Sequence, residues 1–157
     1  MLEKKETQNT WKVDNFNTLL EVAKVVLEKA TTLSKEKNKS IVVALQGDLG
    51  SGKTTFTKQI AKILGITENV TSPTFVIQKR FKIENHHFRE LIHIDTYRID
   101  LADELVRLGW HQDLVENNNL IVVEWPENIS DILPPETITL KFTFVDEVTR
   151  EVSLIEN

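Results

Sequence analysis

One segment near residue 50 matches the phosphate-binding P-loop pattern G-x-x-x-x-G-K-[ST]. Its residues are Gly47-Asp48-Leu49-Gly50-Ser51-Gly52-Lys53-Thr54, and Thr55 follows directly. Glycine is needed in such a loop because backbone N–H groups must curl around phosphate oxygens with no Cβ in the way. The pattern predicts that Lys53 reaches the β- and γ-phosphates of a nucleotide and that the Thr54 hydroxyl binds Mg²⁺.

The segments on either side of this loop have the patterns that a P-loop requires. An apolar run over residues 41–46 predicts a buried strand, and residues 54–64 carry apolar side chains at helical spacing. Gly65 is a stop signal for that helix. The helix N-terminus would add free N–H groups and partial positive charge to the site. A strand, this loop and a helix in that order predict nucleotide binding.

The rest of the chain alternates helical and strand patterns. A long helix is expected from Asn15 to about Lys37, with Asp14 or Asn15 as its N-cap. The other expected elements are strands over 75–81, 90–94 and 120–123, short helical turns over 101–115, and a hairpin of 137–145 with 151–155. The prediction is an α/β protein: a P-loop NTPase-like three-layer fold with a mixed, partly parallel central sheet and β-hairpin additions.

Length and composition narrow the class of protein further. The 157 residues are expected to form a single domain built around the P-loop, 1–157, whose first twelve residues are a loosely ordered N-terminus. The start is polar and no stretch approaches the ~20 apolar residues of a membrane span, so a cytoplasmic protein without membrane contact is expected. The chain lacks cysteine, which excludes disulfides and thiolate metal sites. Its net charge of −5 argues against tight RNA binding by this chain alone.

Two carboxylates follow apolar strand patterns, as expected where a P-loop enzyme orders Mg²⁺ or the attacking water. Asp95 ends the run 91–95, and Glu124 ends the more uniformly apolar run 120–124. Either acid would also fit as an ordinary strand-end cap. We assign Glu124 to the metal, through an ordered water, and Asp95 to orienting water or sensing the γ-phosphate.

Two further side chains are candidates for the surroundings of the site. Of the four histidines, which show no metal-ligand spacing, only His93 lies in a strand that leads to an expected site carboxylate. Trp125 directly follows Glu124. A tryptophan at such a place fits equally well as a core residue or as a ligand contact.

Several motifs, taken in order, resemble the bacterial TsaE (YjeE) proteins, small P-loop ATPases required for the threonylcarbamoyladenosine (t6A) modification of tRNA at position 37. The likeness spans roughly residues 14 to 155. The motifs are the P-loop through Thr55, Ser72-Pro73-Thr74-Phe75, His93-Ile94-Asp95-Thr96-Tyr97-Arg98, Glu104-Leu105 before Leu108-Gly109, and Val123-Glu124-Trp125-Pro126. A P-loop alone is shared by many families, whereas this ordered set is far more specific.

The resemblance implies cofactors and roles for matching residues. ATP would be held by residues 48–55, and Mg²⁺ by Thr54 and Glu124. Lys53, Asp95 and Glu124 would serve turnover. The segment from Asp14 to Thr18 would lie near the adenine, and Arg150 matches a basic position in the C-terminal hairpin. Ser51, where the family usually has alanine, is one of a few departures, and none of them touches a phosphate or metal ligand.

The resemblance also implies partners. The modification chemistry would belong to a TsaB–TsaD-type heterodimer, and this chain would be an accessory ATPase, slow alone, that binds and resets that complex. It would meet tRNA only indirectly, through the complex, which suits an acidic protein.

Other functions of P-loop proteins require sequence features of their own. The main alternative is a P-loop small-molecule kinase, but the chain has no arginine-rich lid segment to shield a transferring phosphoryl group from water. A GTPase is disfavoured because no Asn-Lys-x-Asp motif occurs. A third alternative is a nucleotide-dependent binding module whose hydrolysis is incidental. It would differ from an ATPase mainly in whether replacing Asp95 or Glu124 abolishes function while leaving the complex able to form.

Overall fold

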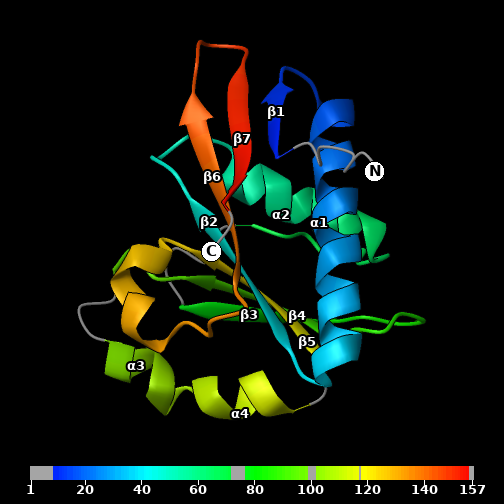
Figure 1. Cartoon of the computed structure of the whole chain (residues 1–157), viewed down its shortest axis with the longest axis vertical. Helices are drawn as coiled ribbons and strands as arrows, with labels where there is room; N and C mark the ends of the chain where they lie inside the picture. The colour runs from blue at the N-terminus through cyan, green and yellow to red at the C-terminus, as the bar shows by residue number, and fades with distance from the viewer. Residues whose placement is uncertain (1–8, 72–76, 99–101, 117, 156–157) are drawn as a thin grey trace, which may run out of the picture.

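A seven-stranded mixed sheet runs through the molecule and is covered by helices on both faces (Figure 1). The computed structural model describes residues 9–71, 77–98, 102–116 and 118–155. The elements are β1 (Thr10–Val13), α1 (Phe16–Lys37), β2 (Ile41–Gln46), α2 (Lys53–Ile63), β3 (Gln78–Lys82), β4 (Glu90–Asp95), α3 (Ala102–Arg107), α4 (Trp110–Val115), β5 (Asn119–Glu124), a 3-10 helix η1 (Pro126–Ile132), β6 (Ile138–Phe144) and β7 (Arg150–Ile155).

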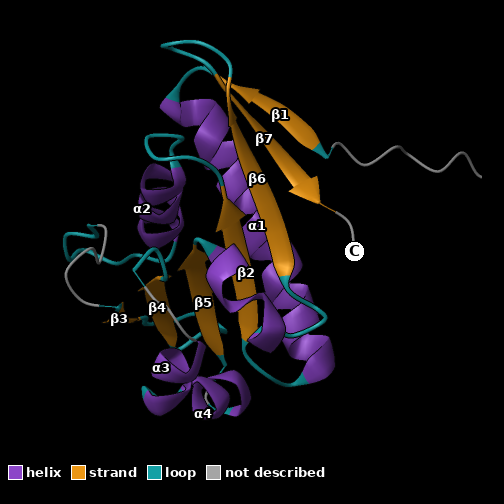
Figure 2. Cartoon of the chain, turned by 90° about the vertical axis from the view of Figure 1, so that its left-hand side faces the viewer, coloured by secondary structure: helices purple, strands orange, loops and turns teal. Residues whose placement is uncertain are grey.

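The strands follow the order β1-β7-β6-β2-β5-β4-β3 across the sheet, from β1 at one edge to β3 at the other (Figure 2). The central strands β6, β2, β5 and β4 are parallel, and β7, β1 and β3 add antiparallel pairings at the two edges. The predicted mixed, partly parallel α/β sheet with hairpin additions is therefore confirmed. Strands buried on both faces read as near-continuous apolar runs, which is why β2 and β5 were recognisable from sequence.

Alternating side chains of the central strands enter two separate apolar layers. Residues such as Val43 and Val122 pack beneath α1 and α2, whereas Val42 and Ile121 pack against Leu105 of α3 and the residues around it. Successive side chains of a strand point to opposite faces, so alternate residues of a strand lie on the same face of the sheet. His93, Asp95 and Glu124 have the parity of the face that α1 and α2 cover.

The N-terminal segment differs from the expectation. Residues 10–12 do not form a loose start, because Thr10–Val13 is strand β1, which pairs with β7, and the Trp11 side chain is buried. Helix α1 begins at Phe16, and Asn15 is its N-cap, accepting a hydrogen bond from the Thr18 backbone N–H at 2.9 Å. A four-residue strand with one inward tryptophan gives almost no periodic signal, and its pairing partner lies at the other end of the chain.

Two other expected elements shift at their ends. The strand predicted over 75–81 is β3 at Gln78–Lys82, and residues 75 and 76 lie outside the described residues. The helical turns predicted over 101–115 are α3 and α4, separated at Gly109, which has a φ of +96°. Among the described residues, no helix is both long and apolar enough to cross a membrane.

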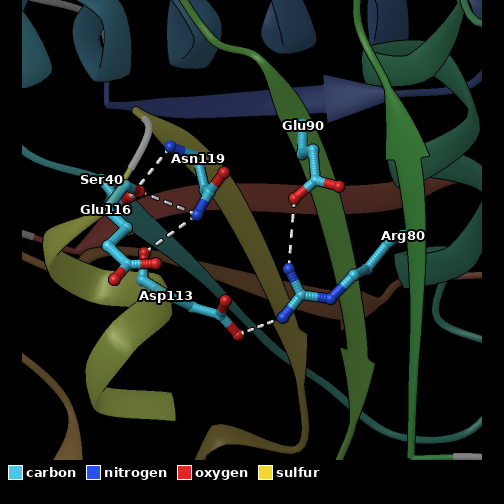
Figure 3. Close-up of polar contacts among 6 residues, drawn as sticks. All are labelled: Ser40, Arg80, Glu90, Asp113, Glu116 and Asn119. Atoms are coloured by element: carbon cyan, nitrogen blue, oxygen red, sulfur yellow. Dashed lines mark hydrogen bonds and ion pairs between the residues drawn. The ribbon is translucent and has the colours of Figure 1, made fainter. Parts of the chain in front are cut away.

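A polar network fastens α4 to the sheet at the end far from the P-loop (Figure 3). The buried Asn119 amide donates to the carbonyls of Asp113 and Glu116, each at 3.0 Å, where α4 ends. Its backbone N–H donates to Ser40 Oγ at 2.8 Å. Arg80 bridges β3 to α4 through the Asp113 carboxylate at 2.5 Å. The two bonds from the Asn119 amide satisfy carbonyls at the helix C-terminus, where intrahelical partners run out.

Candidate functional site

The P-loop joins the C-terminal end of β2 to the N-terminus of α2. Gly47 has a φ of +153°, and a Cβ there would lie 2.6 Å from Ser51 Oγ and 2.8 Å from the Phe142 carbonyl oxygen. Any side chain would therefore force the loop away from β6. Gly52 has a φ of +104° and is the N-cap of α2. The two glycines thus let the backbone turn sharply from β2 into α2, and the first turn of a helix offers free N–H groups to an anion.

Lys53 is buried at the start of α2, with 4% of the residue exposed. Its ammonium donates to the Gly47 carbonyl and lies 3.8 Å from the centre of the Trp125 ring. Burial lowers the pKa of Lys53 below its usual value, while four carboxylates act in the opposite direction: Glu124, Glu127, Asp95 and Asp48. In this structure the ammonium is thus held in the loop by the Gly47 carbonyl and the Trp125 ring.

Glu124 at the end of β5 meets Thr54 in the first turn of α2 and His93 within β4, two residues before the end of that strand. Thr54 Oγ1 donates to Glu124 Oε1 at 3.2 Å, with Oε2 at 3.4 Å. The other close contact of the carboxylate is His93 Nε2, which lies 2.7 Å from Oε2. The side chains of Glu124 and His93 are both buried. The sequence predicted Thr54 and Glu124 as joint metal ligands, and the fold brings their oxygens together.

The strand end that carries Glu124 is held in an unusual backbone conformation. Trp125 has a φ of +60°, which is rare for a bulky residue and costs about 1–3 kcal/mol. Thr96 holds this turn, because its hydroxyl donates to the Glu124 carbonyl at 2.9 Å and to the Trp125 carbonyl. Asn128 Nδ2 in turn donates to the Thr96 carbonyl at 2.7 Å. The turn swings the Trp125 ring over Lys53 and beside Tyr97, with 5.0 Å between the last two ring centres.

Asp95 lies beside Glu124, since the two are register partners at the ends of the parallel strands β4 and β5. Its Oδ1 accepts a hydrogen bond from the Tyr97 backbone N–H at 2.9 Å. This contact orients the carboxylate where the chain leaves the sheet. Both predicted strand-end acids therefore reach the same edge of the sheet as the P-loop, which is where parallel α/β folds bind ligands.

Two cavities flank the P-loop. The first, about 520 Å³, is the phosphate-side cavity, and it is lined by residues 49–55 of the loop and by Asp95, Tyr97, Arg98, Glu124 and Trp125. The second, about 310 Å³, is the hairpin-side cavity, and it lies between the start of α1, the β6–β7 hairpin and the loop. Its lining is mostly apolar, with Asp14, Glu147 and Arg150 as the charged members.

Most of the predicted site residues line one of these cavities. The phosphate-side cavity takes in Leu49 to Thr55, Asp95 and Glu124, and the hairpin-side cavity takes in Asp14 and Arg150. Arg150 also donates to the Gly50 carbonyl at 3.3 Å. Two residues are placed differently. Asp48 lines neither cavity, and its influence on Lys53 is through charge. Thr18 also lines neither cavity; its backbone N–H donates to the N-cap Asn15 of α1.

Phe142 and Val148, which complete the hairpin-side cavity, were not identified from the sequence. Phe16 also lines it and falls within the segment 14–18 that was expected near the adenine, and both Phe16 and Val148 are largely exposed. No local pattern distinguishes such side chains from surface residues, because two distant segments create the cavity only after the sheet has formed. The Ser72-Pro73-Thr74-Phe75 motif lies outside the described residues.

The donor set near Glu124 suits a magnesium ion bound together with a nucleotide. In the described part of the chain, no group of three or more His, Cys, Asp or Glu side chains forms a metal site. Mg²⁺ is usually held by one or two protein oxygens plus waters and substrate phosphates, not by an all-protein cage. A threonine hydroxyl and a carboxylate 3.2 Å apart, at the mouth of a P-loop, provide such a pair.

Comparison with known proteins assigns the chain to the family suggested by its motifs. The family model described as threonylcarbamoyl adenosine biosynthesis protein TsaE matches residues 20–152. A relative from Rickettsia felis, named tRNA threonylcarbamoyladenosine biosynthesis protein TsaE, is 36% identical over 82% of this chain and 72% of its own length. The protein of the same name from Bacillus subtilis is 39% identical over 71% of this chain and 67% of its own length.

Solved structures give the same answer for the fold. The crystal structure of Bacillus subtilis YdiB superposes with a TM-score of 0.68 at 29% identity, covering 94% of this chain and 84% of that one. The similarity therefore extends over the sheet and the P-loop together.

Proposed function

The chain belongs to the TsaE family, and from this membership we propose that it acts in the t6A modification of tRNA as a Mg²⁺-dependent ATPase. The observation that carries the ATPase proposal is the group of Lys53, Thr54 and Glu124 at one P-loop. An ammonium, a hydroxyl and a carboxylate line a single 520 Å³ cavity there. ATP and Mg²⁺ are the ligands that this chemistry fits.

Each residue has a proposed task. Lys53 would leave the Gly47 carbonyl and bind the β- and γ-phosphates. Thr54 and Glu124 would hold Mg²⁺, Glu124 through an ordered water, and the ion would neutralise charge on the phosphate oxygens. Asp95, with its carboxylate oriented by the Tyr97 N–H, would position the attacking water. The hairpin-side cavity, whose lining is mainly apolar, would take the base, with Asp14 and Arg150 at its rim.

We further propose that the chain works as an accessory of a TsaB–TsaD-type heterodimer, which it binds and resets, and that it meets tRNA only through that complex. Hydrolysis by the isolated chain should be slow. A stabilising arginine supplied by a partner can raise such a rate by about 10³–10⁵-fold. The net charge of −5 supports a role that needs no RNA-binding groove on this chain.

ATP turnover by the purified chain tests this proposal when it is measured alone and with a TsaB–TsaD heterodimer, with and without tRNA. Asp95→Asn should still bind ATP, yet tRNA modification should stall after few cycles because the hydrolytic water is no longer oriented. Asp103→Asn is a matched control, since this exposed aspartate on α3 lines neither cavity. Multiple-turnover modification by Asp95→Asn at the wild-type rate would show that hydrolysis is not what this chain contributes.

A further inference from the structure

His93 is a buried polar residue in an apolar layer. It lies on β4, between the buried Ile92 and Ile94, and its side chain is 0% exposed. Its neighbour in the register on β5 is Val122, which belongs to the layer beneath α1 and α2. Burying an imidazole in such a layer costs free energy unless its polar atoms are paired. A histidine at this place therefore needs a partner that accounts for it.

The partner is Glu124. His93 Nε2 lies 2.7 Å from Glu124 Oε2, and we assign the hydrogen of this contact to Nε2, with the carboxylate oxygen as the acceptor. His93 Nδ1 is buried and has no hydrogen-bond partner among the described residues. One nitrogen of the ring is thus left unsatisfied while the other makes a short bond to the carboxylate. The ring therefore makes its bond to Glu124 even though its other nitrogen has no hydrogen-bond partner among the described residues.

The two oxygens of the carboxylate have different surroundings. Oε2 lies 2.7 Å from His93 Nε2 and 3.4 Å from Thr54 Oγ1, whereas Oε1 contacts Thr54 Oγ1 at 3.2 Å. The terminal torsion of a glutamate is broad, so an unsupported carboxylate would rotate freely. The bond from His93 removes that freedom and keeps one oxygen directed toward Thr54.

We infer that His93 is a positioning residue for the metal site: by holding Glu124 Oε2 it directs Oε1 toward the ordered water through which Glu124 would hold the divalent cation of the bound nucleoside triphosphate. This inference rests on the proposed function, because it concerns the same Mg²⁺. His93 itself would touch neither the ion nor the nucleotide. Groups that orient a metal ligand in this way typically change metal affinity by about 10–100-fold when they are removed.

The test is the ATP affinity of the isolated chain, measured by calorimetry with Mg²⁺ and again with EDTA. The difference between the two conditions is the Mg²⁺-dependent gain. His93→Leu should reduce this gain by about 10–100-fold while leaving the affinity in EDTA unchanged. His93→Gln can place an amide N–H where Nε2 was and should restore most of the gain. His93→Asn, whose amide is too short to reach Glu124, should behave like His93→Leu.

Val122→Ala is a matched control for core damage, since Val122 lies beside His93 on the same face of the sheet. It should lower thermal stability without changing the Mg²⁺-dependent gain. If His93→Leu fails to fold, the contrast between the glutamine and asparagine variants still tests the inference, because both keep a polar amide. Equal gains in these two variants would overturn it, as would an equal loss of affinity with Mg²⁺ and in EDTA.

The wild-type chain separates this inference from the function on which it rests. If wild-type ATP affinity does not rise with Mg²⁺, the proposed Mg²⁺-dependent function is wrong and the inference falls with it. If the wild-type gain is present and His93→Leu retains it in full, the inference alone is wrong.

Discussion

Replacing Lys53 by methionine should leave the stability of the free protein nearly unchanged but remove most of the stabilisation that ATP gives. In the free protein the ammonium is buried, and its lowered pKa, caused by desolvation, means that folding disfavours the charged form. Methionine fills a similar volume without a charge. It loses a charged hydrogen bond to Gly47, worth about 1.5–3 kcal/mol, and a cation–π contact of about 2 kcal/mol with Trp125. It also removes a desolvation cost of several kcal/mol.

These contributions oppose one another, so the free energy of unfolding of the free Lys53→Met protein should stay within about 1 kcal/mol of wild type, or about 2–4 °C in Tm. The bound state should differ strongly. ATP at 100 times its Kd stabilises wild type by about 2.7 kcal/mol, which raises Tm by about 5–11 °C. Losing a charged hydrogen bond to phosphate raises Kd about 10- to 150-fold, which leaves only about 0.3–1.4 kcal/mol of this stabilisation at the same concentration.

Thermal unfolding followed by circular dichroism, with and without Mg²⁺ and ATP, measures both effects. The direction of the pH dependence provides a second check. Because the pKa of Lys53 is lowered, the folded protein releases this proton before the unfolded chain does as pH rises. Between the folded pKa of Lys53 and the usual value of 10.5, the unfolded chain therefore binds more protons than the folded protein. The free energy of unfolding of wild type should rise with pH across that range relative to that of Lys53→Met. A free variant destabilised by more than about 3 kcal/mol, or one that keeps its full ATP-induced shift in Tm, would refute this reasoning.

Two further substitutions separate the metal site from the scaffold. Glu124→Ala should weaken ATP binding when Mg²⁺ is present and leave it unchanged in EDTA, because the carboxylate acts through the ion; an equal loss in both titrations would assign Glu124 a structural role. Asn119→Ala should leave ATP affinity unchanged but lower the free energy of unfolding by about 2 kcal/mol, a loss of about 4–8 °C in Tm, because two hydrogen bonds to the end of α4 disappear. An unchanged Tm in a thermal melt of that variant would contradict the role of the network.

Helix and strand patterns were readable from sequence wherever local chemistry decided them. The apolar runs of β2 and β5 are buried on both faces, and the glycines of the P-loop are needed for backbone reasons that act within a few residues. A long helix such as α1 can also be predicted from sequence, through its apolar periodicity and its side-chain N-cap. The edge strand β1 did not, because its four residues become a strand only by pairing with β7.

The candidate site shows the same division. Residue types and strand patterns were enough to predict the chemical groups and the sheet edge at which they gather: a phosphate-binding loop, and carboxylates at the ends of strands. Three other features arise only on folding: His93 bonds to Glu124, Trp125 covers Lys53, and Phe16 and Val148 line one cavity. These contacts join residues far apart in the chain, and their geometry depends on sheet register and on a strained turn. No local propensity encodes that geometry, because it arises from packing of the complete fold.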